Sequence, residues 1–278
     1  MIPAEFDYVA PASLDEALAA LSDGGEDAKL LAGGHSLLPL MKLRLAVPTL
    51  LVDLRKVGLS SISRDDGTAR FGAMVRHHAV ASGGFGLASA AAATIADQQV
   101  RNMGTIGGTL AHGDPASDMP AVLLATDGSV VVRSAEGERE IAAADLFEDY
   151  LTTSIGEQEI ITEVRLPLLE GYGFGYEKFN RRQEDWAMVA VCALVKKAGD
   201  GSCEDVRIGL THMGSTPLRA TAVENALRGG PLNAESIAAA AEQAAEGTEP
   251  PADLNASADY KRHLARVLTK RALEAASQ

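Results

Sequence analysis

The sequence predicts an α+β fold in three segments. Short strands and helices alternate irregularly through residues 5–167, without internal repeats. Gly171, Gly173 and Gly175, interleaved with aromatic residues, then mark a boundary, after which three strands precede three helices. Strands and helices that segregate in this way are typical of the α+β class. We expect two subdomains and a C-terminal domain at residues 1–56, 57–169 and 170–278.

The first segment is predicted to fold as β-α-β-(α)-β. Ser13 and Glu16 form a capping box, which favours a helix beginning there. Strands are expected over residues 5–9, 29–32 and 50–54, and a short helix over 37–45. In that short helix, Leu38, Met41 and Leu45 are expected to face inward. Alternating strands and helices imply a small parallel sheet with right-handed crossovers.

The second and third segments are predicted to be richer in antiparallel pairs. In the second, strands are expected over residues 69–75, 130–132, 140–141 and 159–166, and helices over 88–96 and 119–125. Glu136-Gly137 closes a hairpin between two of these strands. In the third, Asp200-Gly201 makes a tight turn. Its strands are expected over 174–179, 187–196 and 205–212, and its helices over 218–227, 234–244 and 258–275.

Composition and charge narrow the class of protein. Apolar residues make up 46% of the 278-residue chain and charged residues 23%, as in ordinary globular proteins with a core. The net charge of −13 would repel nucleic-acid phosphates and anionic membranes. We find no signal peptide and no run of about 18 apolar residues, and therefore expect a cytoplasmic protein without membrane insertion.

Cysteine usage limits the cofactors that this chain can hold. Cys192 and Cys203 are its two cysteines, a number that suits a reducing compartment without a disulfide framework. An iron–sulfur cluster requires about four thiolates. We therefore do not expect this chain alone to carry such a cluster.

Two Gly-Gly turns flanked by hydroxyl side chains suggest one divided phosphate site. They consist of Ala32, Gly33, Gly34, His35 and Ser36, and of Thr105, Ile106, Gly107, Gly108 and Thr109. Backbone N–H groups in glycine turns can bind phosphate in an acidic protein, because glycine accepts a positive φ and lets a ligand approach. Neither turn belongs to a Rossmann or Walker pattern, and each is also compatible with an ordinary structural turn.

Further candidate residues each allow a structural and a functional interpretation. Asp118 is predicted to be the N-cap of the helix that begins at Met119, and its carboxylate could also accept hydrogen bonds from sugar hydroxyls. Trp186, the only tryptophan, is either a core residue or an exposed ring that covers a flat ligand. The adjacent His77 and His78 point to different faces, so no metal site is expected there. The sequence contains no G-x-S-x-G elbow, the turn that carries the nucleophile of α/β-hydrolases, so it gives little support for a hydrolase.

Several stretches together resemble a known family. They are AGGHSLLPLMKLRLA (32–46), GAMVRH (72–77), TIGGTLAHGDPASDMPAVLLA (105–125), YEKFNRRQEDWAMVAV (176–191), GSTPLRATAVENALRG (214–229) and ASADYKRHLARVLTKRAL (256–273). Over almost the whole chain they resemble the FAD-binding medium subunits of carbon monoxide dehydrogenase and related molybdenum hydroxylases. The resemblance implies a two-subdomain FAD-binding fold of the vanillyl-alcohol oxidase type. A three-stranded antiparallel sheet with three helices would follow it.

The resemblance also implies roles for individual residues. The two Gly-Gly loops would embrace the FAD pyrophosphate, although relatives often carry Asn or Ser where Thr109 stands. Asp118 would contact FAD hydroxyls, and Lys178 matches a family lysine on the first C-terminal strand. Trp186 occupies a position that is often Tyr, close to the isoalloxazine. No catalytic residue and no metal site is implied on this chain.

The function implied by the resemblance is electron transfer. A large molybdopterin subunit would oxidise the substrate, and electrons would pass through the 2Fe–2S clusters of a small subunit to FAD on this chain and then to an external acceptor. The expected assembly is a dimer of heterotrimers. One alternative is a standalone flavin oxidase of the same fold, and another is a nucleotide-binding module that has lost FAD.

Overall fold

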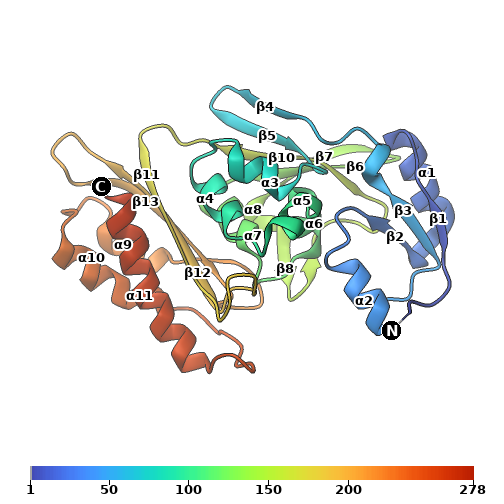
Figure 1. Cartoon of the computed structure of the whole chain (residues 1–278). Coiled ribbons are helices and arrows are strands. Elements are labelled where there is room, and N and C mark those ends of the chain that lie inside the picture. Colours follow the sequence, from blue (N-terminus) through green and yellow to red (C-terminus); the bar gives the residue numbers. More distant parts are fainter. Residues whose placement is uncertain (1) are drawn as a thin grey trace.

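The computed structural model describes residues 2–278. Its N-terminal part is a three-stranded sheet in the order β1-β3-β2, with both pairs of strands parallel. This confirms the predicted small parallel sheet, which lies beside the chain's N-terminus in Figure 1. Its elements are β1 (Asp7–Val9), α1 (Leu14–Gly24), the 3-10 helix η1 (Gly25–Asp27), β2 (Ala28–Leu31), α2 (Leu37–Leu43), β3 (Leu50–Asp53) and the 3-10 helix η2 (Leu54–Lys56).

The helix α2 is shorter and more exposed than the sequence suggested. It ends at Leu43, because Arg44 takes a left-handed backbone conformation with φ 59°. Met41 is buried as predicted, whereas Leu38 and Leu45 are 39% and 73% exposed, so the predicted inward face was wrong for these two residues. A sheet of three short strands is too small to cover a second row of side chains on this helix.

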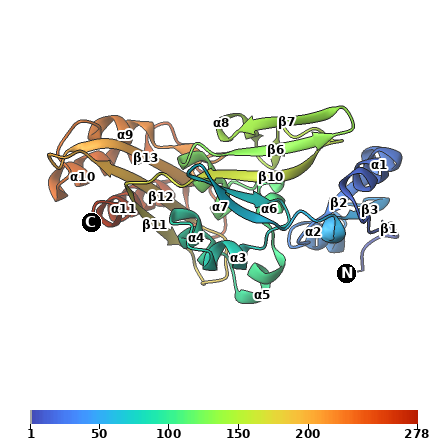
Figure 2. The same ribbon diagram turned by 90° about the horizontal axis from the view of Figure 1, so that it is seen from above.

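The middle part is a five-stranded antiparallel sheet, in the order β4-β5-β10-β6-β7, with helices on one face. It occupies the centre of Figures 1 and 2, between the N-terminal elements and the C-terminal sheet. The strands of this sheet are β4 (Ile62–Asp65), β5 (Thr68–Gly72), β6 (Ser129–Ser134), β7 (Gly137–Ala142) and β10 (Ile160–Pro167). Two further strands, β8 (Phe147–Asp149) and β9 (Thr152–Thr153), form a separate antiparallel pair. The helices are α3 (His77–Ser82), α4 (Leu87–Ala93), α5 (Gln98–Met103), α6 (Ile106–His112), α7 (Asp118–Ala125) and α8 (Ala143–Leu146).

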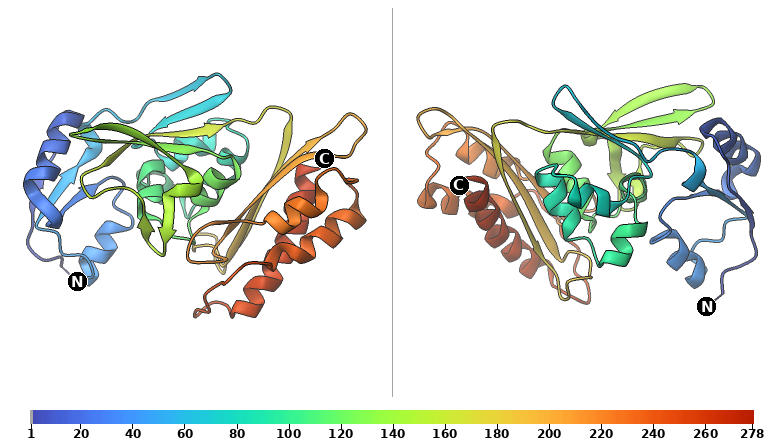
Figure 3. Two further views of the ribbon diagram at one scale, coloured as in Figure 1. Left: turned by 180° about the vertical axis from the view of Figure 1, so that it is seen from behind. Right: turned by 45° about the horizontal axis from the view of Figure 1, so that its top comes forward.

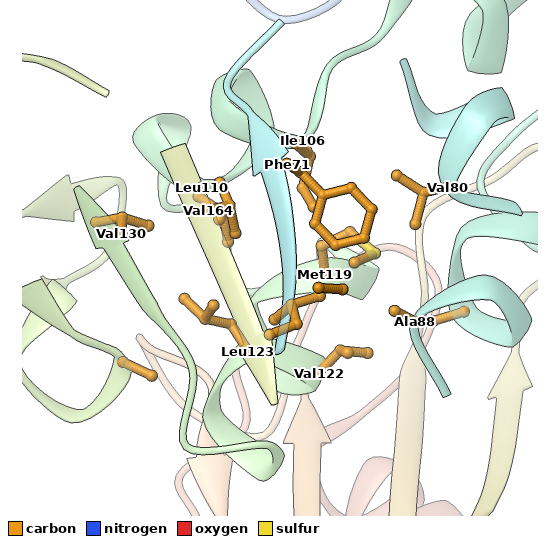
Figure 4. Close-up of a cluster of buried hydrophobic side chains, with 14 of the residues drawn as sticks. Phe71, Val80, Ala88, Ile106, Leu110, Met119, Val122, Leu123, Val130 and Val164 are labelled. Carbon is orange, nitrogen blue, oxygen red and sulfur yellow. The ribbon is translucent and has the colours of Figure 1, made fainter. Parts of the chain in front are cut away.

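The core of this part joins the sheet to its helices. Phe71 of β5 and Val164 of β10 are completely buried and share one hydrophobic cluster with Ile106, Met119 and Leu123 of the helices. Figure 4 shows these side chains converging between the strands and the helices. The helices α6 and α7 are therefore fixed to the sheet.

The prediction of a Gly-Gly turn at residues 107–108 was wrong. Both glycines lie inside α6, which Thr105 caps by accepting a hydrogen bond from the Gly108 N–H at 3.1 Å. A Cβ on Gly107 would lie 2.7 Å from the Ala73 carbonyl oxygen. Glycine is therefore required here for close packing of the helix on the end of β5.

The C-terminal part is an antiparallel sheet in the order β11-β12-β13-β14, covered on its outer face by three helices, as Figure 3 shows. The three predicted strands are confirmed. The helix expected from residue 218 begins later, because Leu218 and Arg219 pair with β13 as a fourth strand. The elements are β11 (Tyr172–Phe179), β12 (Val189–Lys197), β13 (Cys203–Thr211), β14 (Leu218–Arg219), α9 (Thr221–Leu227), α10 (Ala234–Ala241), the 3-10 helix η3 (Glu242–Ala245) and α11 (Ala258–Ala276).

The inner face of the C-terminal sheet packs on α7. A Cβ on Gly209 of β13 would lie 2.4 Å from the Ala121 carbonyl oxygen, and the Cys192 thiol donates a hydrogen bond to the same oxygen at 3.4 Å. Arg207 and Arg219 both form ion pairs with Asp127, just beyond α7. The C-terminal sheet is therefore held directly against the middle part. Among residues 2–278, none of the helices combines the length and apolarity needed to cross a bilayer.

Candidate functional site

A cleft of about 610 Å³ runs between the N-terminal sheet, the helices α5 to α7 and the first strand of the C-terminal sheet. Its volume is in the range of small-molecule and cofactor sites. Every predicted site residue except Ile106 lines it: Ala32, Gly33, Gly34, His35, Ser36, Thr105, Gly107, Gly108, Thr109, Asp118, Lys178 and Trp186. Folding thus brings together three stretches that are far apart in the sequence.

Ile106 is the predicted site residue that points elsewhere. Its side chain is completely buried in the core of the middle part. Its N–H donates a hydrogen bond to the Val75 carbonyl at 3.0 Å. Ile106 therefore anchors α6 to the sheet and leaves the cleft wall to its neighbours.

The first glycine loop presents free backbone donors. Within residues 2–278, none of the N–H groups of Gly33, Gly34, His35 and Ser36 donates to another protein group. Gly34 has φ +77°, a conformation that side chains rarely adopt. Such consecutive unpaired amides form an anion-binding concavity and normally find a partner, so this loop is suited to hold phosphate oxygens.

The second glycine loop differs, because its amides are already paired. The Gly107 N–H donates to the Ala73 carbonyl at 2.9 Å, the Gly108 N–H to Thr105 Oγ1, and the Thr109 N–H to the Thr105 carbonyl at 3.1 Å. The expectation that both loops offer backbone donors was therefore wrong for the second loop. This loop instead gives the cleft its shape and the side chains of Thr105 and Thr109.

Close backbone contact fixes the two stretches relative to each other. A Cβ on Gly33 would lie 2.6 Å from the Met103 carbonyl oxygen and 2.8 Å from Gly104 Cα. Gly108 faces the other side of the first loop, where a Cβ would lie 3.5 Å from Ala32 Cβ. The close approach of the first loop to residues 103–104 thus requires a glycine at position 33.

Asp118 is buried at the opposite side of the cleft, where two side chains from β11 bind it. Its carboxylate accepts hydrogen bonds from the Tyr176 hydroxyl at 2.5 Å and from Lys178 Nζ at 3.0 Å. Lys178 also donates to the Thr94 carbonyl at 3.2 Å. Burial, followed by the adjacent Asp118 charge, raises the pKa of Tyr176 well above its usual value, which keeps this hydroxyl a donor.

Asp118 is the first residue of α7, so the prediction that it is the N-cap was wrong. Ser117 takes the extended N-cap conformation, and its hydroxyl makes no hydrogen bond within residues 2–278. The Asp118 carboxylate instead binds the β11 side chains. Sequence reasoning missed Tyr176, although it lies two residues before Lys178 on the same face of a strand.

Trp186 lies at the far end of the cleft, where it is 54% exposed. This excludes its interpretation as a core residue and leaves its ring free to cover a ligand. A smaller cavity of about 220 Å³ lies on its other side, lined by Arg181, Arg182, His212 and Asp253 among others. Trp186 therefore lines both the cleft and this smaller cavity.

His77 and Ser117 are buried cleft residues that sequence reasoning did not single out as ligands. His77 is 4% exposed, and its Nδ1 has no partner within residues 2–278. Burial lowers the pKa of His77 to about 4, helped by the nearby His35 and Arg76, so the imidazole is neutral at pH 7. Both residues lie within stretches that carried the resemblance, which could have pointed to them.

Two family models match the chain end to end. The FAD binding domain in molybdopterin dehydrogenase matches residues 4–169, and the CO dehydrogenase flavoprotein C-terminal domain matches residues 174–276. This chain belongs to the flavoprotein family of the molybdenum-containing dehydrogenases and is an oxidoreductase subunit. The resemblance stated from the sequence is confirmed.

Individual relatives match this chain along nearly their whole length. The chain is 41% identical to the carbon monoxide dehydrogenase medium chain of Hydrogenophaga pseudoflava, covering 99% of this chain and 98% of the relative. It is also 41% identical to the 6-hydroxypseudooxynicotine dehydrogenase complex subunit alpha of Paenarthrobacter nicotinovorans, covering 98% and 95%.

Solved structures of relatives have the same fold. The carbon monoxide dehydrogenase of Hydrogenophaga pseudoflava matches with a TM-score of 0.95 and 43% identity, over 99% of this chain and 98% of that chain. The quinoline 2-oxidoreductase of Pseudomonas putida 86 matches with a TM-score of 0.95 and 34% identity, over 100% and 99%.

Proposed function

We propose that this chain is the FAD-binding electron-transfer subunit of a heterotrimeric molybdenum hydroxylase. The observation that carries the proposal is the cleft itself, in which a loop of unpaired amides faces a buried acidic residue and an exposed tryptophan. The chain would receive electrons from the 2Fe–2S clusters of a small partner and deliver them to an external acceptor. When bound, FAD supplies this redox chemistry.

The residues of the cleft fit the parts of this cofactor. The N–H groups of residues 33–36 suit the oxygens of a pyrophosphate, which need donors. Asp118 has lone pairs beyond those used by Tyr176 and Lys178, and these can accept hydrogen bonds from sugar-alcohol hydroxyls. Trp186 offers a flat apolar face for the ring system. These residues bind and orient the cofactor, and we assign no catalytic acid or base.

The proposed partners are a large molybdopterin subunit and a small iron–sulfur subunit, in a dimer of heterotrimers. Relatives of the chain include medium chains of carbon monoxide dehydrogenase, which supports a multi-subunit enzyme. The two cysteines, Cys192 and Cys203, are both buried and free, which supports placing the clusters on another chain. We also propose a cytoplasmic location and the division at residues 1–56, 57–169 and 170–278.

The experiment is purification of the chain with its co-purifying partners, followed by a visible absorption spectrum and FAD quantification. We expect flavin absorption, a large molybdenum-containing chain and a small iron–sulfur chain. An assembled complex that binds no FAD under any condition would refute the proposal. Turnover of an organic substrate by the chain alone would favour a standalone flavin oxidase.

The amide loop can be tested with a matched pair of glycine variants. Gly34→Ala places a Cβ at φ +77°, 2.9 Å from the end of the Leu38 side chain, and shifts the amides of the loop. Gly58→Ala imposes the same kind of strain at φ +88°, in open space away from the cleft. We expect Gly34→Ala to lower FAD affinity by at least about tenfold, because hydrogen bonds to charged groups are strong. Equal affinities in the two variants would show that the loop is structural.

A further inference from the structure

A polar cluster around the buried Lys261 lies behind Trp186, on the C-terminal domain. His212, at the end of β13, has a left-handed backbone with φ 64°. Its Nδ1 lies 2.8 Å from the Ala187 carbonyl oxygen and its Nε2 lies 3.3 Å from Lys261 Nζ. The Lys261 side chain is completely buried and donates to Asp253 Oδ2 at 2.7 Å. The binding role proposed above does not use this cluster.

The hydrogen bonds fix the protonation state of His212. A carbonyl oxygen can only accept, so Nδ1 carries the proton, and an ammonium can only donate, so Nε2 accepts. Burial lowers the pKa of His212, and the neighbouring Lys261 lowers it further, while the Ala187 hydrogen bond, Asp253 and Asp114 oppose this effect without cancelling it. The imidazole is therefore held neutral in its Nδ1–H tautomer.

The Asp253 carboxylate compensates the charge of the buried Lys261 ammonium. An unpaired ammonium inside a protein would be very costly. Burial alone would raise the pKa of Asp253, but the Lys261 bond and the N–H groups of Asn255 and Ala256 lower it to about 2. The three side chains are thus one electrostatic unit that spans β13, the loop before α11 and α11 itself.

The contacts of His212 reach two walls of the cofactor cleft. The His212 ring bonds the carbonyl of Ala187, the residue directly after Trp186. The His212 N–H donates to the Pro115 carbonyl at 2.8 Å, three residues before Asp118. His212 therefore forms hydrogen bonds both next to Trp186 and in the loop that leads to Asp118.

We propose that His212 is a positioning residue, which Lys261 and Asp253 orient so that it fixes Trp186 and the loop before Asp118 at the ring end of the cleft. The inference rests on the proposed function in that this cleft is taken to hold FAD. The His212 side chain is 16% exposed and bonds the cleft wall at the Ala187 carbonyl, while the backbone N–H of His212 bonds the Pro115 carbonyl. It therefore acts through other residues.

The test uses the fact that Trp186 is the only tryptophan. Acrylamide quenching of tryptophan emission in the full chain, without added FAD, reports how firmly this ring is held. His212→Leu removes both ring contacts, whereas His212→Asn keeps a donor near the Nδ1 position and tolerates a left-handed backbone. Lys261→Met removes the orienting donor, and Lys270→Met on the exposed side of α11 is its control.

We expect His212→Leu and Lys261→Met to increase acrylamide quenching and to weaken FAD binding by about tenfold, because a cleft wall that is no longer held in place must be ordered when FAD binds. His212→Asn should stay closer to wild type than His212→Leu, and Lys270→Met should match wild type. If His212→Leu does not fold, Lys261→Met carries the same test.

The outcomes separate this inference from the proposed function. Unchanged quenching in a folded His212→Leu or Lys261→Met chain would overturn the positioning role, whatever happens to FAD. Increased quenching with wild-type FAD affinity would also overturn it, because positioning would not serve the cofactor. If neither the wild-type chain nor its assembled complex binds FAD, the proposed function fails, while increased quenching would still show that His212 positions Trp186.

Discussion

At the scale of single residues, the site depends on buried polar groups with few alternative partners. Asp118 and Lys178 are 6% and 5% exposed in their side chains and neutralise each other across the domain boundary. Tyr176 adds a neutral donor to the same carboxylate. Because the pair carries no net charge, it can hold a carboxylate in the cleft without leaving an isolated buried ion.

Removing the Tyr176 hydroxyl should weaken cofactor binding without unfolding the chain. Tyr176→Phe keeps the buried ring, and Asp118 still has its bond from Lys178. Without one of its two side-chain donors, Asp118 is held less firmly and must be ordered when FAD binds, which predicts roughly a tenfold weaker FAD affinity, measured by titration. The control is Tyr150→Phe, because that ring is 60% exposed and does not line the cleft. Equal effects of the two variants would contradict a role for Tyr176.

His77 should make stability depend on pH. The pKa of His77 is about 4 in the folded chain and the ordinary 6.5 in the unfolded chain. Between these two pH values, His77 is therefore protonated in the unfolded chain but neutral in the folded one. Its stabilising contribution is complete above pH 6.5 and falls progressively between pH 6.5 and 4. From pH 7.5 to 5.5, we expect a loss of about 1 kcal/mol from this group.

Urea unfolding at these two pH values, both above the isoelectric point near 4.9, measures the effect. His77→Gln should remove about 1 kcal/mol of the pH dependence, whereas His78→Gln, at the exposed neighbouring position, should keep it. A His77→Gln chain with the full wild-type pH dependence would show that another group is responsible.

At the scale of elements, the two glycine pairs have different physical roles. The first pair forms a loop with unpaired amides, and the second allows α6 to pack on Ala73. Both pairs are Gly-Gly next to hydroxyl residues, so sequence alone did not distinguish them. The difference arises from what each amide meets after folding, and Val75 and Ala73 are distant in sequence from α6.

Gly107→Ala should therefore destabilise the fold. The new Cβ would lie 2.6 Å from Ala73 Cβ and 2.7 Å from the Ala73 carbonyl oxygen, and neither can move freely. We expect the free energy of unfolding to fall by about 1–3 kcal/mol, as for overpacked sites. Gly199→Ala, which meets nothing within 4 Å, is the control. Wild-type stability in Gly107→Ala would mean that α6 can move away from the sheet.

At the scale of the whole molecule, α7 joins the cofactor cleft to the C-terminal domain. Its first residue carries the cleft carboxylate, and Asp127 beyond its end pairs with Arg207 and Arg219 of the C-terminal sheet. Arg219 also binds Glu224, which is 4% exposed. The two ends of one helix are therefore connected to the same sheet by ion pairs.

Replacing Arg219 should destabilise the junction of the domains. Arg219→Leu leaves the buried Glu224 without its principal cation, which predicts a loss of about 3 kcal/mol in the free energy of unfolding. Arg262→Leu removes an exposed pair with Asp259 and should cost less than about 1 kcal/mol. Urea unfolding of both variants measures the contrast. Similar losses would show that the junction tolerates an unpaired Glu224.

Much of the architecture could be predicted from sequence, because periodicity and turn residues act locally. The parallel N-terminal sheet, the hairpin at residues 129–142 and the three C-terminal strands follow from such signals. The helix α5 was missed, and the N-cap was placed one residue late at Asp118. The clustering of His212, Lys261 and Asp253 was also not visible, because it depends on packing between separate elements.

The unpaired amides of residues 33–36 have a consequence for the salt dependence of binding. A site made of amides carries no formal charge, and five acidic and two basic side chains line the cleft around it in a chain of net charge −13. A pyrophosphate dianion therefore enters against a repulsive long-range field. Dissolved ions screen that field but not short hydrogen bonds. Added salt should consequently favour association here, whereas it weakens association at phosphate sites built from lysine and arginine.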